Sequence, residues 1–280
     1  MLQQTRVAAV IEHYHEFLRR FPTIEKLAAA REPSVLAAWS GLGYYRRARM
    51  LHAAAKVIVR EHGGKFPSAA VELLALPGIG RYTSAAIASI AFDEPVAVVD
   101  GNVERVVQRI SGRKLAGEAL WKTAETLLDQ SRPGDFNQAM MELGATVCTP
   151  RAPQCMRCPV VAHCATRGEF TVTTAPAPQK KREVHYVLDC RQGKVFLVRR
   201  PADASLMARM WELPESSIQH ENGDALFTLR HSITVTDYTV RIWRARLPST
   251  ASGTWVPVKR LRRLALTGLA RKILKKAEML

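Results

Sequence analysis

Four cysteines in the middle of the chain have the residue type and the spacing expected of ligands to one metal centre. They form a C-x6-C-x2-C-x5-C array within residues 148–164, made up of Cys148, Cys155, Cys158 and Cys164. Disulfides are the alternative in a secreted protein, but thiols stay reduced in the cytosol. A structural zinc site usually spaces its ligands as two short pairs, and only one pair here is short. The spacing therefore favours a [4Fe–4S] cluster, which is held by soft thiolate ligands.

A glycine-rich turn is the second feature that could do chemistry. The turn Leu76-Pro77-Gly78-Ile79-Gly80 lies between two predicted helices. Gly78 and Gly80 lack Cβ atoms, so a tight turn can present backbone N–H groups at a helix N-terminus, where a phosphate oxygen binds. An ordinary helix–helix turn is the alternative interpretation.

An acidic residue at a predicted helix start, Asp100, follows about twenty residues after this turn, in the segment VVDGNVERV. Aspartate at such a position most simply caps the helix by accepting hydrogen bonds from its first amides. Taken alone, Asp100 is therefore interpreted as an N-cap.

Helices are expected to position these features. Apolar residues recur at helical spacing from the start of the chain, as in Val7, Val10, Ile11 and Tyr14. Gly and Pro residues separate further predicted helices, at residues 34–40, 45–62, 68–75, 81–92, 100–112, 118–131 and 135–146. The first half of the chain is therefore predicted to be all-helical.

The pattern changes after residues 171–183, where TVTTAPAPQKKRE has the composition of an exposed linker. The segments VHYVLDC and KVFLVRR flank a turn at residues 191–193, and residues 225–247 are rich in β-branched and aromatic side chains. These segments predict strands and a smaller α+β domain. Cys190 lies on one predicted strand and is expected to be a buried core thiol.

Charge points to nucleic acid as a partner. The 280-residue chain has 47% hydrophobic residues and a net charge of +16, and a cytosolic protein this basic most often meets nucleic acid. Residues 166–280 hold 21 basic and 10 acidic residues, with a basic run from Lys259 to Lys276. A solvated helix face is the alternative interpretation of that run. The sequence shows neither a signal peptide nor a run of ~18 apolar residues, so we expect no membrane segment and a cytoplasmic location.

Three motifs occur in a characteristic order: LPGIG at residues 76–80, VDGNVERV at residues 99–106, and the four-cysteine loop. In this order they resemble the helix-hairpin-helix superfamily of DNA glycosylases with an iron–sulfur cluster. The segments MLQQTRV, GLGYYRRAR, HGGKFP, LPGIGRYT, VVDGNVERV and FNQAMMELGATVCT resemble, more specifically, the MutY family of adenine DNA glycosylases. The resemblance covers residues 1–165 almost without interruption and extends more weakly over the rest.

The resemblance implies a mainly α helix-hairpin-helix glycosylase domain over residues 1–165, including the [4Fe–4S] loop at residues 148–164. A linker at residues 166–183 and a smaller α+β MutT-like (Nudix-like) domain over residues 184–280 would follow. The implied activity is a hydrolase that excises adenine mispaired with 8-oxoguanine or guanine in base-excision repair. The implied protein is a monomer that acts on double-stranded DNA in a bacterial cytoplasm, where DNA binding associates it with the nucleoid.

The resemblance also assigns roles to single residues. Asp100 would be the ionised carboxylate beside the sugar cation, and Tyr82 would line the adenine pocket. Endonuclease III has a lysine that forms a Schiff base where this chain has Tyr82, and a phenol cannot do so, which implies a monofunctional glycosylase. The DNA-binding residues would be the base-stack wedges Gln4 and Tyr44, Asn102 at the phosphate backbone, and Leu76, Gly78 and Gly80 of the hairpin.

The family's proton donor is a glutamate that lies just before the MLQQT motif, and this chain begins at MLQQT. We favour a start codon assigned too late, with a helical segment of roughly three dozen residues, several helical turns, encoded upstream. The alternative is a catalytically impaired protein that binds DNA lesions, because the general acid is absent. Glu142 is a carboxylate near the family motifs, and its simpler interpretation is an exposed helix residue.

The MutT-like domain would recognise 8-oxoguanine opposite adenine. It lacks the Glu-rich box of Nudix hydrolases, which implies binding without nucleotide hydrolysis. The family commonly has Phe-Ser-His in the loop that reads the oxidised base, and the best local match here is Arg230-His231-Ser232. His231 and Ser232 are therefore the expected DNA-binding residues of this domain.

Overall fold

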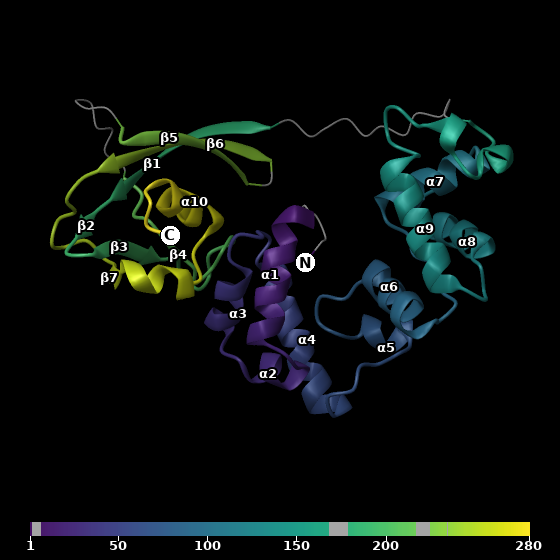
Figure 1. Ribbon diagram of the computed structural model, residues 1–280, viewed down its shortest axis with the longest axis horizontal. Coiled ribbons are helices and arrows are strands. Elements are labelled where there is room, and N and C mark those ends of the chain that lie inside the picture. The colour runs from purple at the N-terminus through teal and green to yellow at the C-terminus, as the bar shows by residue number, and fades with distance from the viewer. Residues whose placement is uncertain (2–6, 168–178, 217–224, 234) are drawn as a thin grey trace. The chain divides into compact units, whose positions relative to one another are not determined.

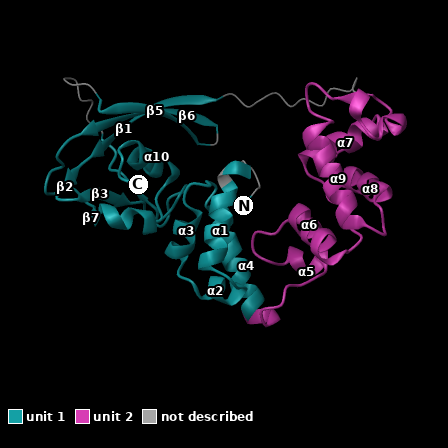
Figure 2. Ribbon diagram, viewed as in Figure 1, with its two compact units in different colours: residues 1–59, 177–280 teal, residues 60–176 magenta. Residues whose placement is uncertain are grey.

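The computed structural model describes residues 1, 7–167, 179–216, 225–233 and 235–280 (Figure 1). The chain forms two compact units (Figure 2). One unit combines residues 1–59 with residues 177–280, and the other consists of residues 60–176.

The discontinuous unit begins with helices and joins them to the end of the chain. Its helices are α1 (Val7–Arg20), α2 (Ile24–Ala29), α3 (Glu32–Trp39) and α4 (Arg46–His62), the last of which continues into the second unit. Their core contains Phe17, Leu36 and Trp39, together with Met210 and Ala265. The hydroxyls of Ser40 and Tyr45 donate to the Leu266 carbonyl at 3.0 and 3.2 Å. Segments assigned to two domains in the sequence analysis thus share one core.

The rest of this unit is built from two small sheets. In one, β1 (Lys180–Leu188) pairs in parallel with β6 (Thr236–Arg244), which pairs antiparallel with β5 (Phe227–Ile233). In the other, β3 (Lys194–Arg199) pairs antiparallel with β2 (Cys190–Arg191), β4 (Trp211–Glu212) and β7 (Thr254–Pro257). The apolar faces of both sheets pack with α10 (Gly268–Lys276), and η3 (Val258–Arg263) precedes this helix. This arrangement confirms the predicted smaller α+β fold, although β1 begins inside the span predicted as linker.

The second unit is helical and carries the predicted chemistry. Its elements are α5 (Ala70–Leu74), α6 (Arg81–Phe92), α7 (Gly101–Ser111), α8 (Gly117–Leu127), α9 (Pro133–Thr146), and the 3₁₀ turns η1 (Cys155–Arg157) and η2 (Val161–His163). Val103, Val106 and Val107 of α7 form its core with Leu120 of α8 and Met140 of α9. The predicted helical character of the first half is confirmed. No helix of the described residues is long and apolar enough to cross a membrane.

Candidate active site and cysteine loop

The glycine-rich turn connects α5 to α6 as predicted. Leu76 is buried, and its carbonyl accepts a hydrogen bond from the Ile79 amide at 3.2 Å. Gly78 has φ +76°, a left-handed conformation that favours glycine. Gly80 is the N-cap of α6 and has no side chain with which to satisfy the first amides of that helix. The N-terminus of a helix without a side-chain cap is a common place for an anion to bind.

Asp100 caps α7. Its Oδ1 accepts hydrogen bonds from the amides of Asn102 and Val103, both at 2.8 Å. Its Oδ2 accepts from Asn102 Nδ2 at 3.2 Å. The capping role inferred from sequence is therefore present, and the half-buried carboxylate is held in one orientation by three hydrogen bonds.

Tyr82 lies close enough to Asp100 for the two side chains to interact electrostatically. The half-buried phenol donates to Met141 Sδ at 3.8 Å. Burial raises the pKa of Tyr82, and the negative charge of Asp100 raises it further. The phenol therefore remains protonated at neutral pH, and it stands beside a carboxylate.

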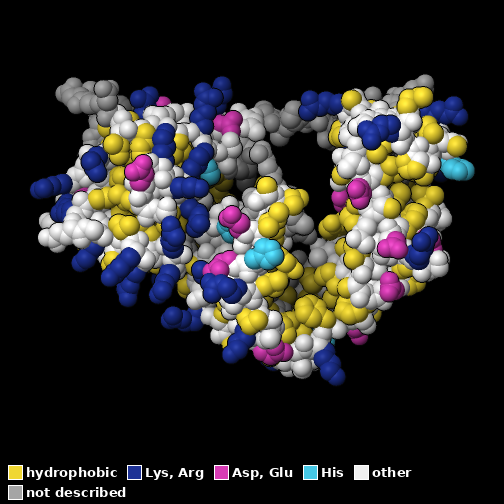
Figure 3. All heavy atoms as spheres, viewed as in Figure 1, with side chains coloured by type: hydrophobic (Ala, Val, Ile, Leu, Met, Phe, Trp, Pro, Cys, Tyr) yellow, Lys and Arg dark blue, Asp and Glu magenta, His cyan; other side chains and the backbone are white. Residues whose placement is uncertain are grey.

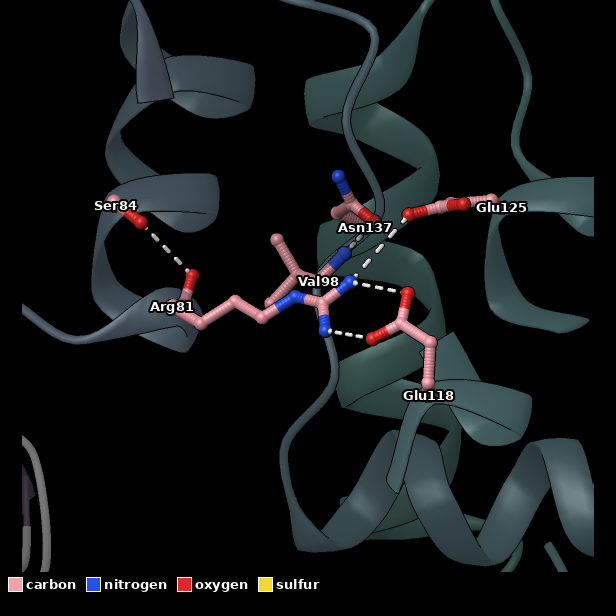
Figure 4. Close-up of polar contacts among 6 residues, drawn as sticks. All are labelled: Arg81, Ser84, Val98, Glu118, Glu125 and Asn137. Carbon is pink, nitrogen blue, oxygen red and sulfur yellow. Dashed lines mark hydrogen bonds and ion pairs between the residues drawn. The ribbon is translucent and has the colours of Figure 1, made fainter. Parts of the chain in front are cut away.

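A buried amide fixes the segment that leads into Asp100. Asn137 of α9 accepts a hydrogen bond from the Val98 amide at 3.0 Å (Figure 4). Its Nδ2 donates to the Val96 carbonyl at 2.9 Å and to Ser89 Oγ at 3.0 Å. Asn137 is 2% exposed, so every polar atom of its side chain is satisfied inside the protein. Asn137 lies within the motif FNQAMMELGATVCT, but no local pattern in the sequence marks it as a buried residue.

Helix α9 also crosses two helices at close range. A Cβ atom on Gly144 would lie 2.8 Å from the carbonyl oxygen of Asn102. A Cβ atom on Gly134 would lie 2.7 Å from the carbonyl oxygen of Ser89. Glycine at both positions lets α9 hold α6 and the first turn of α7 together.

Arg81, the first residue of α6, binds α8 (Figure 4). Its guanidinium forms ion pairs with Glu118 at 2.6 Å and Glu125 at 3.8 Å, and lies 4.1 Å from the centre of the Trp121 ring. The side chains in these ion pairs are about half-exposed, so the pairs contribute little to stability. They do direct Arg81 towards α8.

Two buried arginines connect α7 to the cysteine loop. Arg105 donates to Asn102 Oδ1 at 2.8 Å, to the Gly144 carbonyl at 2.6 Å and to the Cys148 carbonyl at 2.7 Å. Arg109 donates to Cys148 Sγ at 3.3 Å, to the Thr149 carbonyl at 2.8 Å and to the Pro150 carbonyl at 3.0 Å. The same helix thus carries Asp100 at its start and holds the beginning of the loop.

The four cysteines of the loop are free thiols, each half-buried. Among the described residues, no three His, Cys, Asp or Glu side chains form a group that could hold a single metal ion. The donor set nevertheless fits an iron–sulfur cluster, because all four donors are soft sulfur atoms in one short loop. The Arg109 guanidinium also donates a hydrogen bond to Cys148 Sγ, which holds this sulfur atom at the start of the loop.

Other predicted DNA-binding residues lie elsewhere. Gln4 falls outside the described residues. Tyr44 belongs to the discontinuous unit; it is 53% exposed, and the Arg47 guanidinium lies 5.4 Å from its ring centre. His231 and Ser232 lie on strand β5 and not in a loop, and Ser232 Oγ donates to Asp237 Oδ1 at 2.5 Å. Burial lowers the pKa of His231, and the charge of Lys272 lowers it further.

The sequence and fold are similar to those of known DNA repair proteins. Residues 1–128 match the family model described as HhH-GPD superfamily base excision DNA repair protein. A solved thermostable thymine-DNA glycosylase is similar at 31% identity with a TM-score of 0.57, over 60% of this chain and 81% of that one. A trapped endonuclease III–DNA complex shares the fold, with a TM-score of 0.54 at 24% identity. The chain therefore belongs to the HhH-GPD superfamily of base excision DNA repair proteins.

The relatives with higher sequence identity to this chain are adenine DNA glycosylases. Adenine DNA glycosylase of Mus musculus is 51% identical over 281 residues, which cover 79% of this chain and 54% of that protein. Adenine DNA glycosylase of Rattus norvegicus is 37% identical, with 89% of this chain and 58% of that protein covered. The Arabidopsis thaliana protein of the same name is 40% identical, with 84% and 44% covered. The resemblance to adenine DNA glycosylases is confirmed, and the chain spans about half the length of these curated relatives.

Proposed function

We propose that this protein is a monofunctional DNA glycosylase that hydrolyses the bond between adenine and deoxyribose where adenine is mispaired with 8-oxoguanine or guanine. The observation that carries the proposal is the Asp100 carboxylate, fixed at the start of α7 beside the neutral phenol of Tyr82. The named relatives support adenine as the base removed.

Breaking this bond leaves positive charge on the sugar, as in other glycoside hydrolyses. Asp100 stabilises that charge through its carboxylate, which is already oriented by the Asn102 and Val103 amides and needs no rearrangement. Adenine must leave the base stack before it can reach such a site. Tyr82 has no amine, so it cannot form a Schiff base, and the strand remains uncut after the base is released.

We further propose that Cys148, Cys155, Cys158 and Cys164 hold a [4Fe–4S] cluster. When bound, the cluster would supply a rigid structural centre for the loop. The chain's own contribution is the Arg105 and Arg109 contacts, which fix the start of the loop to α7. The loop and the Gly80 end of α6 would then bind the phosphate backbone of double-stranded DNA.

The discontinuous unit would supply recognition of the base opposite adenine. His231 and Ser232 on β5 are the residues proposed for this role, and the resemblance of residues 184–280 to a MutT-like domain supports it. Tyr44, which is largely exposed, would contact the base stack around the mispair.

Single-turnover excision assays test the proposed function. The protein in excess over a labelled duplex with one adenine:8-oxoguanine pair should release adenine, more slowly from adenine:guanine, and leave matched adenine:thymine intact. Tight binding of the mispaired duplex without adenine release would instead support the second candidate, a protein that binds DNA lesions without excising the base. If the protein neither binds the mispaired duplex nor releases adenine, both candidate functions are refuted.

A further inference from the structure

A cationic groove lies in the sheet part of the discontinuous unit, and none of the residues proposed above for catalysis or DNA binding lines it. The groove has a volume of about 800 Å³ and lies between β2, the start of β3 and the segment that follows β6. Its charged and aromatic lining consists of Asp189, Arg191, Lys194, Arg244, Arg246 and Trp255. Lys and Arg side chains are numerous on the visible face of this unit (Figure 3).

A buried carboxylate organises the two sides of the groove. Asp189 is 2% exposed. It accepts two hydrogen bonds from Arg191, at 3.1 Å from Nε and 2.6 Å from Nη2, and one from the Leu247 amide at 2.8 Å. It therefore orients Arg191 on β2. Through the Leu247 amide it also fixes the backbone next to Arg244 and Arg246. Burying a carboxylate costs free energy unless hydrogen-bond partners compensate for it. The partners of Asp189 therefore hold this side of the groove in a defined arrangement.

The electrostatics of Asp189 agree with this geometry. Burial alone would raise its pKa, but the hydrogen bonds from Arg191 and the Leu247 amide, with the charges of Arg191 and Arg246, hold the pKa below its usual value. Asp189 is therefore ionised at neutral pH. The Arg191 guanidinium that it orients lies 4.9 Å from the centre of the Trp255 ring, at the surface of the groove.

The remaining cations of the groove form no ion pair with a described residue, although the charge of Arg246 also acts on Asp189. Within the described part of the chain, the side chains of Lys194, Arg244 and Arg246 form no hydrogen bond or ion pair, whereas the charge of Asp189 is matched by Arg191. The lining thus has four cations and one carboxylate, an excess of three positive charges in a concave surface. Like charges held together in this way are stabilised by a multiply charged anion.

We propose that this groove binds phosphate groups and that backbone phosphates of duplex DNA occupy it. Guanidinium groups present paired N–H donors that match phosphate oxygens, and the groove has room for more than one phosphate. The proposal rests on the DNA binding of the proposed function, but it does not depend on base excision. It adds a second contact with DNA, on β2 and the end of β6.

The indole N–H signal of Trp255 provides a local readout of this groove. The full chain would be labelled with ¹⁵N-tryptophan, which gives five indole signals, and Trp255→Phe would identify the relevant one. Three probes would be titrated at low salt: an undamaged duplex of sixteen base pairs, inorganic tripolyphosphate, and dGTP. The duplex and tripolyphosphate should each shift the Trp255 signal in a saturable manner.

The double variant Arg244→Gln/Arg246→Gln should abolish those shifts. It should also reduce the slope of log Kd for the duplex against log salt by about 1.8, as expected for two lost phosphate contacts. The double variant Lys180→Gln/Lys181→Gln changes the net charge equally at the other end of β1, outside the groove, and should keep the Trp255 shifts.

Other patterns of Trp255 shifts would either change the identity of the bound phosphate or overturn the proposal. A shift with dGTP and tripolyphosphate but not with duplex would support a phosphate site whose source is a free nucleotide. No Trp255 shift with any probe, or shifts that survive Arg244→Gln/Arg246→Gln, would overturn the proposal. If the protein binds no duplex at all, the proposed function fails, while tripolyphosphate still tests the groove.

Discussion

Arg109 donates a hydrogen bond from Nη1 to Sγ of Cys148 across 3.3 Å, although its own side chain is almost fully buried. The arginine is on the last turns of the helix whose first turn is capped by Asp100. One helix therefore connects the proposed catalytic carboxylate with the proposed cluster loop. A displacement of the loop would be transmitted to Asp100 through α7 and through the Arg105 hydrogen bonds to Asn102 and Cys148.

Asp100→Asn should abolish adenine excision while leaving mispair binding nearly unchanged. Asparagine caps a helix about as well as aspartate, so α7 should remain folded. The amide lacks the negative charge needed beside the sugar cation, and excision should fall by at least about 10²–10³-fold. Single-turnover rates and Kd for the adenine:8-oxoguanine duplex measure the two effects. Near-normal excision would limit Asp100 to a capping role.

Asn137→Leu should destabilise the second unit and slow excision. Leucine fills a similar volume but leaves the Val98 amide, the Val96 carbonyl and Ser89 Oγ without their partner. Each unsatisfied buried group costs about 1–3 kcal/mol. Thermal unfolding and hydrogen exchange of the Val98 amide measure the loss.

The neighbouring substitution Gln138→Leu is a matched control for Asn137→Leu, because Gln138 is exposed and its amide donates to the Gly134 carbonyl of the same helix. It should leave stability and the exchange of the Val98 amide unchanged. Equal effects of the two substitutions would show that the Asn137 hydrogen bonds do not fix the segment before Asp100.

Gly144→Ala should lower the free energy of unfolding, whereas Gly101→Ala should leave it nearly unchanged. The new methyl group at position 144 would meet the backbone of Asn102, which cannot move without moving the cap of α7, and such overpacking costs about 1–3 kcal/mol. Apart from its chain neighbours and the backbone of its own helix, a Cβ built on Gly101 meets no described atom within 4 Å. Unfolding free energies of the two variants should differ by this amount, and similar values would contradict the close approach of α9.

The purified protein should be brown and contain roughly four iron and four sulfide ions per chain, as a cubane cluster requires. Cys158→Ser should lose the colour and the iron. Cys190→Ser should retain both, because Cys190 lies on β2 in the other compact unit. Metal analysis and visible absorption test whether the cluster is present. A colourless protein with stoichiometric zinc would refute it.

Tyr186 should make the discontinuous unit sensitive to alkali. Burial raises the pKa of this phenol well above its usual value, and the charges of Glu212 and Glu215 raise it further. Above a pH of about 10 the Tyr186 phenol ionises in the unfolded chain but stays protonated in the folded protein. The free energy of unfolding therefore falls as pH rises. Tyr186→Phe should remove this part of the fall, as urea unfolding between pH 9 and 11 would show. An unchanged slope would contradict the burial effect.

The sequence predicted the helices around the site because their apolar residues recur with the period of a helix, and Gly and Pro mark where they end. The positions of α6, α7 and α9 follow this pattern within two residues. The α+β character of the second half was also predictable, from β-branched segments on both sides of residues 191–193. The short helix α2, with only six residues, is too short for a periodic signal.

The supporting residues of the site could not be predicted in this way. Asn137, Arg105 and Arg109 are polar side chains on helices, where exposure is the usual expectation. Their burial depends on partners 39 to 48 residues away in the sequence, such as Cys148 and Ser89. Local pattern identifies a helix, but it does not identify which polar residue of that helix faces a distant loop.

The discontinuous unit has a consequence for biosynthesis. Ser40 and Tyr45 emerge from the ribosome early, but their hydrogen-bond acceptor, the Leu266 carbonyl, is made 221 residues after Tyr45. At about 5–20 residues per second this separates the partners by roughly 10–45 seconds. Residues 60–176 form a continuous unit that can fold during the interval. The first helices can pack on one another meanwhile, but the part of their core that later receives Met210 and Ala265 stays uncovered until the end of the chain is made.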